Sequence, residues 1–198
     1  MMTAARLFFI LFFLGWGSAA LAGTVRPAAW AGKFYPQAPD ELKRTIAGLM
    51  DQASRTRVDS LPQGRMRALI LPHAGYIYSG LTAAHAHRVL AGTVFTKVIL
   101  MGPDHRVGFA DAAVSDVAAY ATPLGTVPLH ADAGRLRAEA ALFRPVPESD
   151  RSEHCLEVVL PFLQTDLPAM ALVPIVVGRC EPEAIGRAIV PLIDGQTL

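Results

Sequence analysis

Apolar residues are arranged along this chain in two patterns, which predict alternating helices and strands. Short runs that are apolar throughout predict strands buried on both faces, at 68–71, 97–101 and 172–177, with a further candidate at 112–117. Spacing at the 3.6-residue period predicts a helix that begins at Pro39-Asp40, and its apolar face is Leu42, Ile46, Leu49, Met50 and Ala53. A polar loop is predicted for 55–67.

Helical patterns also fill the intervals between the strands. They predict a helix over 79–90 with Ser79 as a possible cap, and another over 152–163 that Pro161 bends or shortens. A last helix is predicted over 181–193. Apolar strands separated by helices indicate an α/β fold with a mostly parallel sheet flanked by helices.

The first 22 residues follow a different pattern. Arg6 precedes an apolar run over 7–14, and small residues then lead to Ala20-Leu21-Ala22. This order is typical of a secretory signal peptide, and the apolar run is shorter than the roughly 20 residues that span a bilayer. We therefore expect cleavage after Ala22 and a mature domain at 23–198, either periplasmic or secreted, which meets a membrane only during export.

Composition narrows the class of protein. The 198 residues are 52% hydrophobic and 18% charged, which suits one globular domain. Lys and Arg together number 18 against 17 acids, and no basic stripe is interleaved with aromatic residues, so we expect no nucleic-acid partner. The two cysteines, Cys155 and Cys180, leave both a disulfide and two free thiols open.

Two histidines follow predicted strands. His73 comes after the first strand in LPHAGYIYSG, and His105 follows the next strong strand in VILMGPDHRVG. The carboxyl ends of parallel strands meet at the edge where open α/β sheets bind ligands, so the two side chains can converge. Two imidazoles with a carboxylate or thiolate would bind zinc, copper or iron. The alternative is that each histidine fixes the shape of its own loop by hydrogen bonding.

A third polar stretch, SEHCLEVVLPFL, places Glu153, His154 and Glu157 on about one predicted helical turn. These residues would supply a proton donor or acceptor, or a carboxylate that orients a metal-bound imidazole; an exposed polar turn is the alternative. The remaining histidines and the aromatic residues near the mature N-terminus are interpreted as packing or surface residues, or stay unassigned: His85, His87, His130, Trp30, Phe34 and Tyr35. Phosphate-binding glycine motifs and a G-x-S-x-G elbow are absent from the sequence.

Four stretches occur in a fixed order: RPAAWAGKFYP, LPHAGYIYSG, GPDHR and EHCLEVVLPFL. Together they resemble the Memo family, whose bacterial members are called AmmeMemoRadiSam system protein B, over nearly all of 23–198. The resemblance implies a fold like that of the class III extradiol dioxygenases, which open catechol rings at a non-haem iron held by two histidines and a glutamate.

Carried over by motif, the resemblance implies that His73 and His105 are metal ligands for iron or copper. It places His154 and Glu153 in the same cleft as candidate catalytic residues. The implied activity is that of a metal-dependent, dioxygenase-like oxidoreductase acting on a small molecule or a peptide. Association with radical SAM and AMMECR-type proteins is implied by the family alone.

The sequence departs from the family pattern in three respects. Family members would continue beyond Leu198 into a strand with an S-S-D-x-S-H-like motif and a third metal ligand, so we expect 23–198 to be about two-thirds of a domain. The family is otherwise largely cytoplasmic, and Cys155 stands where serine is usual. A metal-dependent redox enzyme, a non-catalytic protein that binds a peptide or small ligand in the same cleft, and an inactive fragment all stay open as hypotheses.

Overall fold

The computed structural model describes residues 23–58, 64 and 66–198, and the predicted signal peptide lies outside them. Seven strands are found in this part of the chain: β1 Val25–Arg26, β2 Lys97–Pro103, β3 Ala112–Ala113, β4 Ala119–Thr122, β5 Gly125–Pro128, β6 Phe143–Arg144 and β7 Ala171–Val177. They form a four-stranded sheet in the order β2, β7, β3, β6 and a three-stranded sheet in the order β1, β4, β5. The predicted α/β class is confirmed.

The longest ladder is the parallel pair β2 and β7, which runs in register from Lys97 and Ala171 to Pro103 and Val177. β1 with β4 and β3 with β6 are also parallel, whereas β3 with β7 and β4 with β5 are antiparallel. Side chains of a strand alternate between faces, so Val173 and Ile175 enter one core and Leu172 another. Burial on both faces explains why β7 is apolar at every position.

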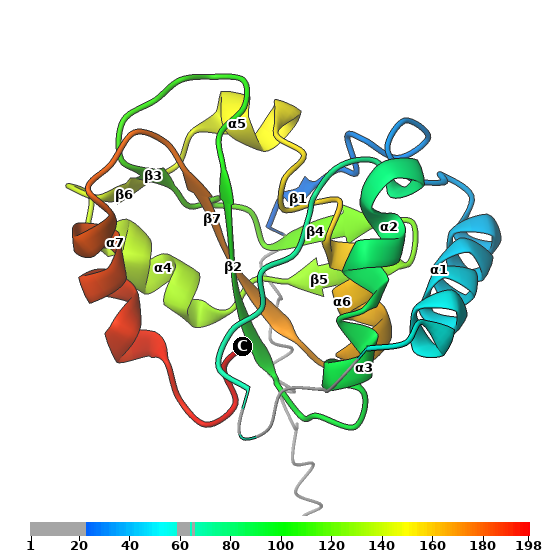
Figure 1. Ribbon diagram of the computed structural model, residues 1–198. Coiled ribbons are helices and arrows are strands. Elements are labelled where there is room, and N and C mark those ends of the chain that lie inside the picture. Colours follow the sequence, from blue (N-terminus) through cyan, green and yellow to red (C-terminus); the bar gives the residue numbers. More distant parts are fainter. Residues whose placement is uncertain (1–22, 59–63, 65) are drawn as a thin grey trace, which may run out of the picture.

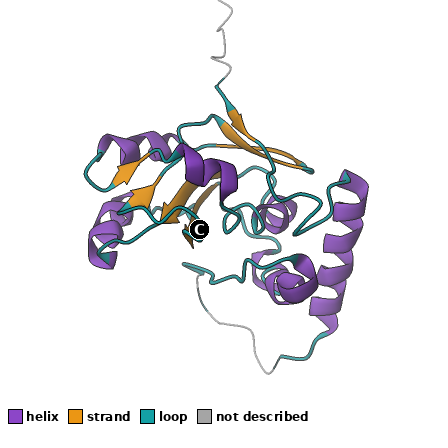
Figure 2. Ribbon diagram, turned by 90° about the horizontal axis from the view of Figure 1, so that it is seen from above, coloured by secondary structure: helices purple, strands orange, loops and turns teal. Residues whose placement is uncertain are grey.

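Helices cover both faces of the four-stranded sheet. Their bounds are α1 Pro39–Arg55, α2 Tyr76–Ala84, α3 His87–Leu90, α4 Ala131–Ala138, α5 Pro147–Ser152, α6 Leu160–Asp166, α7 Pro182–Ile189 and a 3₁₀ turn at Val190–Leu192. Figure 1 shows α4 and α7 on one side of β2 and β7, with α1, α2, α3 and α6 on the other, and Figure 2 shows the same layers from above. No helix in the described ranges is both long enough and apolar enough to cross a membrane.

Several predicted elements are confirmed with shifted bounds. The helix at Pro39 is α1, and its apolar positions are buried or half-buried against α2. The strand at 97–101 continues through Gly102-Pro103, and the strand at 112–117 is reduced to the short β3. The helix at 181–193 is α7 followed by the 3₁₀ turn.

The helix predicted over 79–90 begins earlier and is divided into α2 and α3. Ser79 is not its cap: Gly75 takes that position, and the Ser79 hydroxyl donates to the carbonyl of Ala74 at 3.0 Å from within the helix. A serine inside the first turns can satisfy its hydroxyl on a preceding carbonyl, so its presence did not mark the helix start.

The helix predicted over 152–163 was also wrong in its first half. Ser152 ends α5, residues 153–159 form an irregular segment and turns, and α6 begins at Leu160. Pro161 lies in the first turn of α6, where its missing N–H is no loss, so it starts a helix instead of bending one.

The strand predicted at 68–71 is absent from the described structure, where this segment is extended chain without a ladder partner. A cavity of about 390 Å³ separates it from β2, and the side chain of Ile70 is fully exposed. An apolar run becomes a strand only where a neighbour pairs with its backbone, and here no neighbour does.

A buried ion pair attaches the N-terminal segment to the segment 153–159. Arg26, in β1, donates to the carboxylate of Glu157 at 2.6 Å and to the backbone carbonyl of Glu153 at 2.6 Å. The same carboxylate accepts from the Tyr35 hydroxyl at 2.6 Å and from the backbone N–H groups of Ala29 and Trp30. Four hydrogen-bond donors thus compensate for the burial of the Glu157 carboxylate, which has no exposed surface.

We predict that Glu157→Ala destabilises the protein by about 3–5 kcal/mol, because it leaves the Arg26 guanidinium buried without its counter-ion. Urea denaturation followed by circular dichroism measures the change. The control is Asp51→Ala, which removes the partner of Arg55 in an exposed pair on α1 and should cost less than about 1 kcal/mol. Equal losses in the two variants would contradict the structural role assigned to Glu157.

Candidate metal centre

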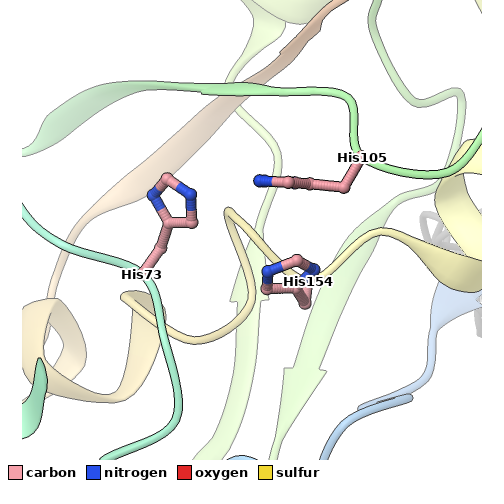
Figure 3. Close-up of side chains that lie close together, drawn as sticks. All are labelled: His73, His105 and His154. Atoms are coloured by element: carbon pink, nitrogen blue, oxygen red, sulfur yellow. The ribbon is translucent and has the colours of Figure 1, made fainter. Parts of the chain in front are cut away.

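Three histidines from three separate loops point into the same space (Figure 3). His73 lies between the extended segment 68–71 and α2, His105 lies two residues beyond β2, and His154 lies two residues beyond α5. All three histidines lie in irregular chain; His105 follows a strand, His154 follows a short helix, and His73 follows a segment without secondary structure. The two histidines predicted at strand ends do converge, although the first does not follow a strand.

The imidazoles are close enough to surround one ion. Ring centroids are 5.2 Å apart for His73 and His105, 5.9 Å for His73 and His154, and 4.5 Å for His105 and His154. One nitrogen from each ring lies within 4.8 Å of the others. Three nitrogens this close together are near enough to be ligands of a single transition-metal ion.

The Glu153 carboxylate joins two of these loops. One oxygen accepts from the backbone N–H of His105 at 2.8 Å, and the other lies 2.9 Å from His105 Nδ1. That second oxygen also accepts from the backbone N–H groups of His154 and Cys155, at 2.8 and 2.9 Å. A carboxylate that accepts a hydrogen bond from Nδ1–H leaves Nε2 of His105 available as a ligand.

Electrostatics favours an ionised Glu153 beside the neutral forms of His73 and His154. Burial alone would raise the pKa of Glu153, but hydrogen bonds from His105, Cys155 and His154 outweigh it and lower this pKa to about 2. The pKa values of His73 and His154 are lowered, mainly by burial and further by neighbouring histidines. A neutral imidazole carries the lone pair that binds a metal, so the protonation states suit coordination.

His154 carries an unsatisfied nitrogen. Its Nδ1 is buried and has no hydrogen-bond partner in the described structure, although Glu153 Oε1 lies 3.1 Å away in a geometry unsuited to a hydrogen bond. A buried nitrogen without a partner is costly unless something else occupies its lone pair. The donor set of three imidazoles therefore fits a bound transition metal.

A second cluster, made of His105, Glu153 and Cys155, fits less well. The carboxylate of Glu153 is already engaged by several N–H donors, and burial, followed by the nearby Glu153 charge, raises the pKa of the Cys155 thiol. A thiolate is the form that binds metal, so this environment disfavours Cys155 as a ligand. Cys155 and Cys180 are both free thiols, so of the two alternatives that the sequence left open, a disulfide and two free thiols, the structure has the second.

Close packing of β2 against the loop at Cys155 fixes the backbone position from which the chain continues to His105. A Cβ atom at Gly102 would lie 2.5 Å from Cys155 Sγ and 2.9 Å from Cys155 Cβ. Only glycine allows β2 to approach this loop so closely, and the strand then delivers His105 to the Glu153 carboxylate three residues later.

Two aromatic residues form a wall of the site that the sequence analysis assigned to packing. Trp30 and Phe34 contact each other, and their ring centroids lie 5.7 and 4.9 Å from that of His154. Both side chains also pack against the core beside α1 and α2, so that interpretation was incomplete. No local sequence pattern links Trp30 to His154. The nearest signal was that the stretches RPAAWAGKFYP and EHCLEVVLPFL occur together in one family.

The other polar candidates lie elsewhere. Glu157 binds Arg26 and Tyr35 and does not share a helical face with Glu153. His87 pairs with Asp166 at 2.5 Å, and His130 caps α4 through the backbone N–H of Asp132. Thus the structure brings together His73, His105, His154 and Glu153, and leaves these others outside.

Comparison with known families gives one match over most of the chain. The family described as Memo-like protein matches residues 26–196. This range includes all three histidines and Glu153.

Individual relatives are similar over a large share of this chain. Protein MEMO1 of Xenopus laevis is 32% identical over 160 residues, which are 77% of this chain and 51% of that protein. Protein MEMO1 of Mus musculus is 30% identical over 158 residues, again 77% and 51%. A MEMO1 family protein of Caldivirga maquilingensis is 32% identical over 180 residues, covering 86% of this chain and 64% of that protein. The chain spans about half the length of the vertebrate relatives it matches.

We predict that Gly102→Ala destabilises the protein by about 1–3 kcal/mol, because the added methyl group overlaps Cys155 in a packed interior. Urea denaturation measures the loss. The matched control is Gly48→Ala on the exposed side of α1, where a Cβ meets nothing within 4 Å and should add about 0.5–1 kcal/mol of stability. Wild-type stability of Gly102→Ala would show that the strand does not need this close approach.

Proposed function

This chain belongs to the Memo-like protein family, and we propose that His73, His105 and His154 bind one iron or copper ion. The observation that carries the proposal is the convergence of three imidazoles from three loops, two of them held by one buried carboxylate. Imidazole ligands suit iron and copper, and a set of three leaves coordination positions open to other molecules. The ion would supply redox chemistry of the dioxygenase type to a small substrate.

The residues of the chain have separate tasks in this proposal. Glu153 orients His105 through Nδ1 and fixes the backbone of His154. Trp30 and Phe34 cover one side of His154 and keep water from that ligand. His73 borders the cavity of about 390 Å³ along β2, whose lining is mainly apolar, so a substrate can reach the histidines from that side.

The same cavity favours a second candidate, a binding protein without catalysis. Its apolar lining from Leu69, Leu71, Leu100 and Val159 fits an apolar ligand or peptide, and that contact needs no ion. The two candidates differ in what chelation does. A ligand held by the cavity alone stays bound after the metal is removed, whereas a ligand held by the metal is released.

We predict that the protein binds one iron or copper ion per chain, and that His73→Ala, His105→Ala and His154→Ala each lose most of it. Elemental analysis after anaerobic loading and gel filtration measures the metal. The bound ion should also raise the melting temperature, by an amount that a chelator reverses, because it binds only the folded state. His85→Ala, at the end of α2, is the control and should keep full occupancy. Full occupancy in all three site variants would refute the proposal.

Glu153→Gln tests the role of the carboxylate. Loss of the charge weakens the hold on His105 Nδ1 and lowers the basicity of its imidazole, so metal affinity should fall by about 10- to 100-fold. Competition with a metal-indicator dye measures the affinity. The amide keeps the shape of the side chain, and the melting temperature without metal monitors folding. Unchanged affinity would mean that Glu153 only holds the loops.

A further inference from the structure

Two cationic side chains lie against the same aromatic ring at the edge of the histidine cluster. The Arg106 guanidinium carbon is 4.3 Å from the centre of the Trp30 ring, and Lys33 Nζ is 5.3 Å from it. Both side chains belong to exposed residues. Within the described part of the chain, neither has an acidic partner or a side-chain hydrogen bond, so their donors remain available.

Trp30 is fixed in place, which turns these contacts into a defined site. Its backbone N–H donates to the buried Glu157 carboxylate at 2.8 Å, and its indole Nε1–H donates to the carbonyl of Ser152 at 3.0 Å. Phe34 packs against its ring at 4.6 Å between centroids. Cation–π attraction then holds the planar Arg106 guanidinium over an immobile surface.

The acids nearest to Arg106 in the loop are already engaged. Asp104 accepts from the backbone N–H groups of Val107 and Gly108, at 3.2 and 2.6 Å. Glu153 is buried and accepts from His105, His154 and Cys155. Neither carboxylate pairs with Arg106, so its positive charge has no counter-ion in the described part of the chain.

We propose that Arg106 and Lys33, stacked on Trp30, bind the carboxylate or phosphate group of a small anionic substrate beside the histidine cluster. Trp30 contacts His154 edge-on, so a molecule held by this cationic site lies next to the proposed metal ligands. A guanidinium binds an oxyanion through paired N–H donors, and Lys33 adds charge. The inference rests on the proposed function for the role of the metal, but anion binding itself needs none.

The first experiment requires no metal. Trp16 and Trp30 are the two tryptophans of the chain, so a Trp16→Phe background leaves Trp30 as the only tryptophan reporter. Titration of the metal-free full chain with sodium phosphate, and separately with sodium acetate, at constant ionic strength should give a saturable change in Trp30 emission. The change should be lost in Arg106→Gln and kept in Arg44→Gln, an exposed charge removal on α1. Absence of a saturable change, or the same change in Arg106→Gln, would overturn the inference.

The second experiment measures how much an anionic group adds to the affinity of a ligand for the iron-loaded protein. The probes are 4-carboxybenzohydroxamate and its neutral carboxamide analogue, which share a metal-binding head. Calorimetry on the iron-loaded protein should show the carboxylate probe binding about tenfold more tightly, the effect of one charge-assisted hydrogen bond. This ratio should fall to about one in Arg106→Gln and recover partly in Arg106→Lys.

The ratio of the two affinities is not affected by a general loss of folding or of metal, because both probes are measured on the same protein. A ratio that stays at tenfold in Arg106→Gln would assign the preference to another residue. The two emission titrations separate phosphate from carboxylate as the preferred group. Failure of the proposed function appears differently: hydroxamate binding would then be unaffected by chelation, while the metal-free anion titration would still report on Arg106.

Discussion

The structure around the three histidines depends on the buried, ionised carboxylate of Glu153. Its two oxygens accept from the backbone of the loop after β2 and from the backbone of the segment after α5, so one side chain sets the distance between His105 and His154. Burial would otherwise favour the neutral acid, but its several donors keep it charged. That charge also lies near two imidazoles and opposes the loss of proton affinity that burial causes in each.

Glu157, four residues later, performs the same task for the N-terminal segment. It binds Arg26 of β1 and the backbone of Trp30, which brings the aromatic wall to His154. A helix would have placed Glu153 and Glu157 on one face; the irregular segment between α5 and α6 lets their side chains point to different partners. Because both acids are buried, the loss of either would leave polar groups without partners.

The elements predicted most accurately from the sequence are those that hydrophobic periodicity and burial determine. α1, β2 and β7 are long, regular and buried, and the apolar run that predicted β7 is explained by its two covered faces. The prediction of secondary structure failed at 68–71 and at 152–159, where tertiary contacts decide the conformation of the chain. Strand propensity gave no information on whether a partner strand lies alongside, and helical spacing gave none on the buried ion pair at Glu157. The short strands β1 and β6 arise from pairing alone.

The histidine cluster was predictable only in part, for a related reason. The position of His105 just after a core strand is visible in the sequence, whereas His73 was assigned to the same edge through a predicted strand at 68–71 that the structure lacks. The place of His154 depends on the turn after α5, which no periodicity describes. A third ligand was expected beyond Leu198, yet the described residues already bring three imidazoles together. In the proposed metal site this matters, because three imidazoles can hold an ion whose remaining positions are then open to a substrate or to a further ligand.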